Sequence, residues 1–296
     1  MKPSFLNLFM PAHPPGVHCT ATLVAIGIRV LSSNFCQGVP HLSRMKWARM
    51  KWEQLLARHR LAENTRVHSL ESLLDPVWNA LETAHSHFAV GRGPARRYPA
   101  EVVPFGALAD ASQATLEQFE ELLEPGERVY VFGNPPGARN GLTVGPPLHC
   151  HQMLGPLHPA VEAGTEEMDP LLLTSKDASA MVALTSLAFP GFFRQRTCEM
   201  GTYYGIRVDG ELVAMAGERL ALPGFREISA VCTHPAHTGK GYAQKLMTCL
   251  MQEHASAGFR SFLHVSKSNT RAIALYERLG FRVPRSVSLW PISLAS

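Results

Sequence analysis

Residues 231–243 read VCTHPAHTGKGYA, and this stretch decides how the rest of the chain is interpreted. It is a turn that contains Gly239 and Gly241 and leads directly into a helix-like pattern. The apolar positions of that pattern, at helical spacing, are Ala243, Leu246, Met247, Leu250 and Met251. A glycine-rich turn before a helix offers backbone N–H groups and the positive end of the helix dipole to an anion. The stretch therefore predicts a phosphate-binding loop, although such a turn alone is weak evidence.

Two familiar phosphate-binding motifs are excluded by the residues around the glycines. Gly241 follows Lys240 at the position where a Walker A loop needs Ser or Thr for magnesium. Gln244 stands where the dinucleotide-binding motif needs its third glycine. The loop must therefore be interpreted from its neighbours along the chain.

The upstream sequence predicts three antiparallel strands that lead to the loop. Residues 203–208 alternate as a strand, and Asp209-Gly210 is a strong hairpin signal before the partner strand at 212–220. Pro223-Gly224 marks another turn, and residues 227–233 form the third strand. Before them, Thr174 and Asp177 form a capping box for a helix that ends near Ala188.

The downstream sequence predicts a second strand and a second helix. Residues 262–265 form a short apolar strand about one helix length after the loop, which makes a strand–helix–strand unit. Asn269 can cap the next helix and Gly280 can end it. Tyr276 lies in the middle of that helix, next to apolar positions.

This order of motifs resembles the acyl-CoA-binding half of the GNAT superfamily of N-acetyltransferases. The matching segments are V-x-T-H-P, x-G-K-G-Y-A and N-x-x-A-I-x-L-Y-E-x-L-G-F, which are specific in combination, over roughly residues 169–294. Residues 227–235 and 263–265 are most similar to the branch that includes glycine N-acyltransferases. The resemblance implies an α/β (α+β) fold, with a mixed, mostly antiparallel sheet flanked by helices. It also implies acetyl-CoA as co-substrate and no metal.

The resemblance further implies which residues hold the cofactor. Backbone groups of Val231 and Thr233 would pair with the pantetheine arm, and the N–H near Val231 would polarise the thioester carbonyl. The N–H groups of residues 238–244 would hold the pyrophosphate. Asn269 would contact the cofactor or orient the last helix. The expected cofactor-binding residues are Val231, Cys232, Thr233, Thr238, Gly239, Lys240, Gly241, Tyr242, Ala243, Gln244 and Asn269.

Two catalytic roles are also expected from the resemblance. Tyr276 would protonate the departing thiolate, the alternative being an aromatic core residue whose hydroxyl reaches solvent. Glu227 would accept the proton of the attacking amine through a water, the alternative being a carboxylate in solvent at the edge of the sheet. His234 is the second candidate for the base. Cys232 is interpreted as a small apolar residue rather than a nucleophile.

The first half of the chain carries no catalytic motif. Residues 1–44 are rich in proline and predict a poorly ordered extension, and the apolar run 21–31 is too short to cross a bilayer. Residues 45–155 predict a smaller α/β domain, by analogy a degenerate acyltransferase-like half. We expect a helix that kinks at Pro76 or restarts there with Asp75 as its cap, an edge strand or loop at 99–108, a helix at 112–123 and a strand at 129–132. The catalytic domain would cover 165–296.

Composition excludes several classes of protein. Of 296 residues, 46% are hydrophobic and 18% charged, which argues against disorder. A net charge of +4 is too small to indicate a nucleic-acid or membrane-surface partner. The six cysteines form no C-x-x-C pair, so reduced thiols in the cytoplasm are expected. His149-Cys150-His151 and the pair His85 and His87 are not expected to bind metal.

The sequence therefore predicts a cytoplasmic N-acetyltransferase that transfers an acetyl or related acyl group from acetyl-CoA to a primary amine by direct attack. A small-molecule amine is the expected acceptor, and its identity and the oligomeric state stay open. The alternative is a CoA-binding regulatory or interaction protein that kept the fold and lost turnover.

A chain that starts at Met45 is expected to keep the melting temperature and CoA binding of the full chain, because residues 1–44 show no periodic apolar face to bury. Thermal unfolding and CoA titration of both chains check this. A melting temperature several degrees lower in the shorter chain would mean that the run 21–31 docks on the core.

Overall fold

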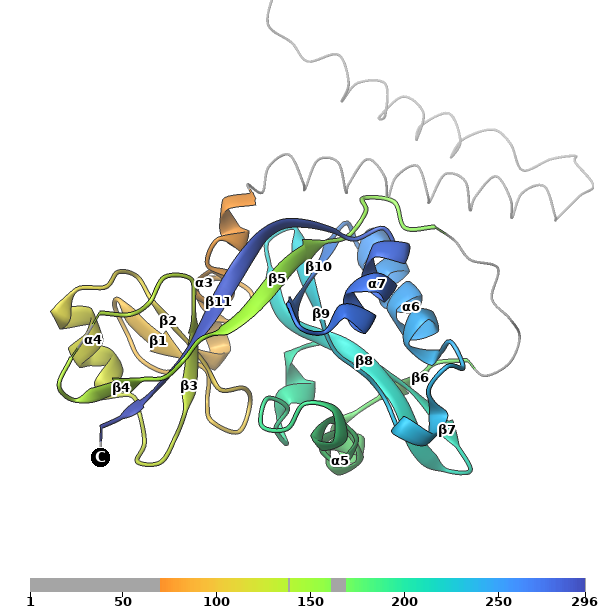
Figure 1. Ribbon diagram of the computed structural model, residues 1–296, viewed down its shortest axis with the longest axis horizontal. Helices are drawn as coiled ribbons and strands as arrows, with labels where there is room; N and C mark the ends of the chain where they lie inside the picture. The colour runs from red at the N-terminus through yellow and green to blue at the C-terminus, as the bar shows by residue number, and fades with distance from the viewer. Residues whose placement is uncertain (1–69, 138, 161–168, 296) are drawn as a thin grey trace, which may run out of the picture. The chain divides into compact units, whose positions relative to one another are not determined.

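The computed structural model describes residues 70–137, 139–160 and 169–295, and its strands form one eleven-stranded sheet (Figure 1). The strands are β1 (Ala95–Arg97), β2 (Phe105–Leu108), β3 (Val129–Phe132), β4 (Leu142–Val144), β5 (Leu148–Leu154), β6 (Leu171–Leu173), β7 (Tyr203–Val208), β8 (Glu211–Leu222), β9 (Phe225–Thr233), β10 (Arg260–Ser266) and β11 (Arg282–Leu294). Their order in the sheet is β1-β2-β3-β11-β5-β10-β9-β8-β7-β6, and β4 pairs with β11. The predicted mixed, mostly antiparallel sheet is confirmed. The predicted extension 1–44 lies outside the described residues.

Helices cover both faces of this sheet. The α-helices are α3 (Pro76–Glu82), α4 (Gln113–Glu120), α5 (Ala178–Ala188), α6 (Tyr242–Ser256) and α7 (Thr270–Arg278). The 3₁₀ turns are η1 (Leu70–Leu73), η2 (Ser86–Phe88), η3 (Ser175–Asp177), η4 (Thr197–Met200) and η5 (Pro235–His237). Helices α6 and α7 share one buried cluster with the strands, whereas α3 and α5 belong to two other clusters. None of the helices in the described ranges is long and apolar enough to cross a membrane.

Local signals in the sequence set the ends of several elements as predicted. The carboxylate of Asp75 accepts the Trp78 N–H and starts α3, so the expected restart at Pro76 is confirmed. Thr174 and Asp177 form the expected capping box at η3, directly before α5. At the hairpin between β7 and β8, Asp209 and Gly210 both have positive φ, 52° and 85°. Such a turn suits a two-residue hairpin.

Two expectations about strands were wrong or incomplete. Residues 99–108 were expected to be an edge strand or loop, but β2 lies between β1 and β3. This is allowed because Pro99 and Pro104 both precede the strand, which needs its N–H groups for pairing. The long strand β11 was not predicted at all, because Pro284 and Pro291 interrupt its pattern. Its pairing with β5 is irregular between Arg282 and Arg285, around the first of these prolines.

The sheet runs without interruption through both predicted domains. The N-terminal part contains the parallel unit β2–α4–β3, and the C-terminal part contains the parallel unit β9–α6–β10. The last strand of the chain, β11, pairs with β3, while β5 from the N-terminal part pairs with β10. Each part therefore places one strand next to the parallel unit of the other part, so the two parts share one continuous sheet.

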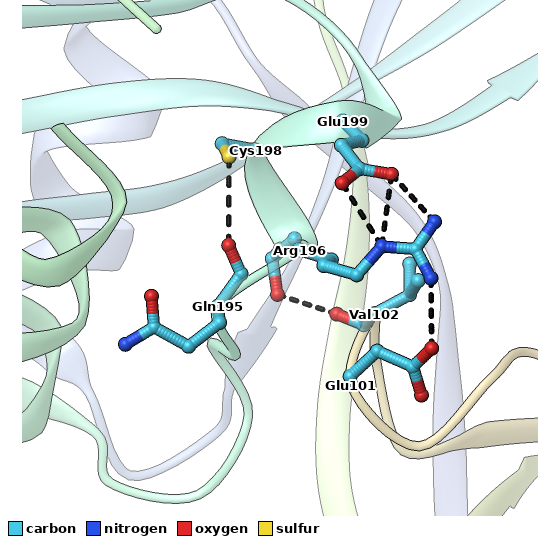
Figure 2. A network of polar contacts seen from close by, with 7 residues as sticks. Glu101, Val102, Gln195, Arg196, Cys198 and Glu199 are labelled. Carbon is cyan, nitrogen blue, oxygen red and sulfur yellow. Dashed lines mark hydrogen bonds and ion pairs between the residues drawn. The ribbon is translucent and has the colours of Figure 1, made fainter. Parts of the chain in front are cut away.

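The segment between α5 and β7 is fastened to the N-terminal part by polar contacts (Figure 2). Arg196 donates to the Glu101 carboxylate at 2.7 Å and also pairs with Glu199 at 2.8 Å. The backbone N–H of Arg196 donates to the Glu101 carbonyl at 3.0 Å. The hydroxyl of Thr197 donates to the Val102 carbonyl at 2.5 Å. These bonds hold the 189–200 segment against the loop that precedes β2.

Gly217→Ala is expected to lower the free energy of unfolding by about 1–3 kcal/mol, the usual cost of overpacking a core. A Cβ at Gly217 would lie 2.1 Å from Cδ1 of Tyr203, whose ring is buried and packs edge-on against Phe193. At Gly137 the nearest atom would be 3.3 Å away, so Gly137→Ala is the matched control. Urea denaturation of the two variants checks this, and equal stabilities would contradict it.

Candidate active site

The site is built where β9 and β10 separate. These parallel strands pair only through Phe225–Glu227 of β9 and Arg260–Phe262 of β10. Beyond this point β9 continues beside β8, and β10 continues beside β5. We call this point of separation the fork. Helix α6 connects the two strands, so its N-terminus lies at the open end of the fork, as the parallel arrangement requires.

A β-bulge lies in β9 just past the fork. Ser229 pairs with Gly217 and Cys232 pairs with Met215, so Ala230 and Val231 together oppose the single residue Ala216. Ala230 has a φ of 53°, in the left-handed region that an alanine rarely adopts. Bulges of this kind bend a strand and re-aim its groups, and they recur next to active sites.

A cavity of about 530 Å³ opens between the end of β9, the loop before α6, and α7. All of the predicted cofactor-binding residues line it, namely residues 231–233, 238–244 and Asn269. Tyr276 lines the same cavity. These predicted residues, which lie up to 45 positions apart in the sequence, thus meet around one space large enough for a ligand.

The loop presents an N-terminus that its own side chains do not cap. Gly239 and Gly241 have φ values of 80° and 77°, which glycine adopts without strain. Gly241 is the N-cap of α6 and supplies no side-chain acceptor, whereas Ser112 caps α4 and Asn269 caps α7 through their side chains. The first turn of α6 therefore faces the cavity in the arrangement that binds anions.

Sequence reasoning missed six residues that line the cavity: Ala188, His237, Arg271, Ala272, Leu275 and Arg278. The Nδ1 atom of His237 is buried and has no hydrogen-bond partner among the described residues. A buried polar atom of this kind calls for a partner, such as a ligand or water. For the α7 residues the signal was available, since Arg271, Leu275 and Arg278 recur at helical spacing around Tyr276.

Burial controls the acid–base chemistry of the cavity. It raises the pKa of the Tyr276 hydroxyl to about 12, so this phenol keeps its proton at neutral pH. Burial also raises the pKa of the Cys232 thiol to about 12, which leaves no thiolate to act as a nucleophile. Asn269 uses its side-chain oxygen to accept the Ala272 N–H at 3.1 Å, so it orients α7.

Glu227 does not line the cavity, and it is fully buried rather than solvated at an edge. Its two oxygens accept hydrogen bonds from Arg219 at 2.9 and 2.6 Å, and one also accepts from Nδ1 of His264 at 2.7 Å. Burial opposes ionisation of this carboxylate, but Arg219 and the His264 hydrogen bond outweigh it and lower its pKa to about 2. A carboxylate with this pKa is a weak base at neutral pH.

His234, the second candidate for the base, also lies outside the residues that line the cavity. Its Nδ1 accepts the Ala236 N–H at 3.2 Å, and its ring lies edge-on to His237 at 5.8 Å. The imidazole therefore caps η5. In the described ranges, no group of three or more His, Cys, Asp and Glu side chains is placed to hold a metal ion.

Known proteins share this architecture. A family model described as FR47-like protein matches residues 203–290. A crystal structure from Novosphingobium aromaticivorans, assigned to the acetyltransferases of the GNAT family, is 33% identical, with 76% of this chain and 99% of that chain covered and a TM-score of 0.67. A GCN5-related N-acetyltransferase from Kribbella flavida is 16% identical, with 72% and 95% covered and a TM-score of 0.52. A Drosophila protein is 17% identical, with 82% and 96% covered and a TM-score of 0.53. The last two show a shared fold, and no curated protein sequence matches the chain.

Glu227→Gln is expected to cost about 3–5 kcal/mol of stability at pH 7, because it leaves the largely buried Arg219 guanidinium without its counter-charge. The folded-state pKa of Glu227 lies below its ordinary value, so its contribution is complete above the ordinary pKa and is lost as the pH falls toward 2. The wild-type protein should therefore lose this stability in acid, and the variant should not.

Urea denaturation between pH 2 and pH 7 measures both effects. The double variant Arg219→Met, Glu227→Gln serves as the control, since it removes both charges and should recover most of the loss. A single variant as stable as the wild type at pH 7 would show that the ion pair does not hold the strands.

Proposed function

The chain belongs to the GNAT family of acetyltransferases, and from this premise we propose that it is an N-acetyltransferase acting on a primary amine. The acetyl group, or a related acyl group, passes from acetyl-CoA to the amine by direct attack in a ternary complex. The observation that carries this proposal is the cavity at the fork. It gathers an uncapped helix N-terminus, a bulged strand and a buried tyrosine in one place.

The residues of the cavity suit a ligand with a phosphate at one end and a thioester at the other. The N–H groups of residues 238–244 hold the pyrophosphate, and the free Nδ1 of His237 supplies one further polar contact. Lys240, Arg271 and Arg278 also line the cavity and add positive charge to it. The backbone of Val231 and Thr233 pairs with the pantetheine arm, and the bulge turns the Val231 N–H toward the thioester carbonyl.

The acyl group passes directly from donor to acceptor, without a covalent bond to the protein. When bound, acetyl-CoA supplies the thioester carbonyl that the amine attacks, so an N–C bond forms and the C–S bond breaks. Tyr276 donates its O–H to the departing sulfur as negative charge develops there. Its pKa of about 12 keeps the phenol protonated until then, and because that value exceeds the pKa of a thiol, about 8.5, the donation completes only while the sulfur carries that charge in the site. The protonated Cys232 does not compete as an acyl carrier.

The attacking amine must also lose a proton. This proton passes to water rather than to Glu227, because the Glu227 carboxylate is buried outside the cavity, is bonded to Arg219 and His264, and holds protons poorly. This weakness is the observation that favours the second candidate function, a CoA-binding regulatory or interaction protein with little or no turnover. Both candidate functions include CoA binding, and they differ in whether the protein turns over an amine.

The N-terminal part is proposed to be a degenerate acyltransferase-like half that shapes the acceptor side. Its unit β2–α4–β3 has the same order as β9–α6–β10. At the start of α4, however, Asp110 accepts the Ser112 N–H at 2.8 Å and the Thr115 hydroxyl at 2.6 Å. A carboxylate thus fills the position where an anion would bind. The proposed acceptor is a small-molecule amine of the cytoplasm.

Tyr276→Phe is expected to lower kcat by about 10²–10⁴-fold while leaving the Kd for acetyl-CoA nearly unchanged, because general acids contribute this much to the reaction step. Thiol release from acetyl-CoA, screened over a panel of amines, measures kcat, and calorimetry measures Kd. Tyr204→Phe is the matched control, since the Tyr204 hydroxyl bonds to Glu253 and lines no part of the cavity.

Full turnover by Tyr276→Phe would mean that water protonates the thiolate. In hydrogen exchange, acetyl-CoA should protect residues 231–246, and Gly241→Val should abolish this protection. Tight CoA binding with no turnover of any amine would favour the binding-protein function. Unchanged protection in Gly241→Val would remove the loop from the site.

A further inference from the structure

Four polar side chains from four neighbouring strands form a line on one face of the sheet. Arg219 lies on β8, Glu227 on β9, His264 on β10 and Gln152 on β5, and these strands are adjacent in that order. We call this line the polar belt. Its links are Arg219 to Glu227 at 2.6 Å, His264 to Glu227 at 2.7 Å and Gln152 to His264 at 3.0 Å.

The polar belt lies on the face opposite α6 and α7. Leu263 and Val265, on either side of His264, pack in the cluster that contains those two helices. Side chains alternate along a strand, so His264 points to the other face. That face holds the cluster that includes Phe225 and Phe262, and the His264 ring packs near Phe262 at 5.8 Å.

The belt fixes which nitrogen of His264 carries the proton. The amide nitrogen of Gln152 lies 2.9 Å from the Leu73 carbonyl, which can only accept, so this nitrogen is a donor. Its second hydrogen points to Nε2 of His264, which must then be unprotonated. The proton is therefore on Nδ1 and is donated to Glu227. Burial lowers the pKa of His264 despite the nearby carboxylate, which agrees with a neutral ring.

The bond between His264 and Glu227 lies at the fork. Glu227 pairs with Phe262 in the last backbone register between β9 and β10. Past this pair the strands have no backbone bonds to each other, and the side-chain bond from His264 reaches back to Glu227 across the beginning of the gap. Val231 follows on one arm of the fork, and Tyr276 follows β10 on α7.

We propose that His264 is a positioning residue for the acyl-transfer site. Its Nδ1–H bond to Glu227 sets how far β9 and β10 separate at the fork, and thereby the position of Val231 relative to Tyr276. The inference rests on the proposed function only for the identity of the ligand. Arg219 on β8 and Gln152 on β5 support this bond from the neighbouring strands. Arg219 keeps Glu227 ionised, and Gln152 keeps the His264 proton on Nδ1. His264 contacts neither the cavity nor the ligand, so it acts on the reaction through the backbone of β9 and β10.

The test compares His264→Leu, His264→Asn and His264→Gln in the full chain. The amide nitrogen of asparagine can reach the place of Nδ1 and donate to Glu227, whereas that of glutamine reaches the place of Nε2. His254→Leu is the matched control, because His254 on α6 is a second buried histidine, whose Nε2 lies 2.8 Å from Glu218 on β8. Its Nδ1 lies 2.9 Å from Ser261 Oγ, in the segment where β9 and β10 are still paired, so it makes no bond across the gap of the fork. The readouts are kcat, the Kd for acetyl-CoA, and hydrogen exchange of residues 231–233.

We expect His264→Leu to lower kcat by about 10- to 100-fold, as a misplacement of about 1 Å can. Its Kd should change less than kcat, since the loop at 238–244 is untouched, and residues 231–233 should exchange faster. His264→Asn should restore most of kcat, and His264→Gln should not. Equal kcat and exchange in His264→Leu and His254→Leu would overturn the proposal. If His264→Leu does not fold, equal kcat in the Asn and Gln variants would overturn it.

A spectroscopic readout tests the belt without any ligand. In protein with ¹⁵N-labelled histidine, the His264 ring, assigned by its loss in His264→Asn, should be neutral at pH 7 with the proton on Nδ1. A proton on Nε2, or a charged ring, would overturn the proposal. If the wild type binds no acetyl-CoA, the proposed function fails, while the exchange and the histidine spectra still decide the role of His264.

Discussion

The separation of β9 and β10 after three backbone pairs is the constraint on which the rest of the site depends. Two parallel strands that part in the middle of a sheet leave a gap that helices α6 and α7 cover but do not fill. The gap is tolerable because each strand keeps its outer partner, β8 or β5. It places a bulged strand, a helix N-terminus and a buried phenol around a single cavity.

Charge and burial give the cavity and the polar belt different chemistries. Burial raises the pKa of Tyr276 and Cys232, so the cavity holds protonated groups. Outside the cavity, Arg219 overcomes the burial of Glu227 and keeps it ionised. A buried ion pair adds little net stability but is costly to break on one side. In this structure the pair between Arg219 and Glu227 instead fixes the arrangement of the neighbouring strands β8 and β9.

Short-range signals predicted much of the fold and the cavity. The caps at Asp75 and Thr174, the hairpin at Asp209 and the glycine turn act within a few residues, so they can be read from the sequence. The strands β5 and β11 and the partners of Glu227 could not be, because they depend on pairings between distant segments. Gln152 meets His264 across 112 positions, and no local pattern marks such a contact. The alternative interpretation of Glu227, a carboxylate in solvent at the edge of the sheet, was wrong for the same reason.

The most direct measurement is a crystal structure of the full chain with a non-hydrolysable thioether analogue of acetyl-CoA. The account predicts pyrophosphate on the N–H groups of residues 238–244, the acyl oxygen within hydrogen-bond distance of the Val231 N–H, and the sulfur near the Tyr276 hydroxyl. An analogue bound elsewhere, or a fork closed by backbone pairing of β9 with β10 past Glu227, would contradict it.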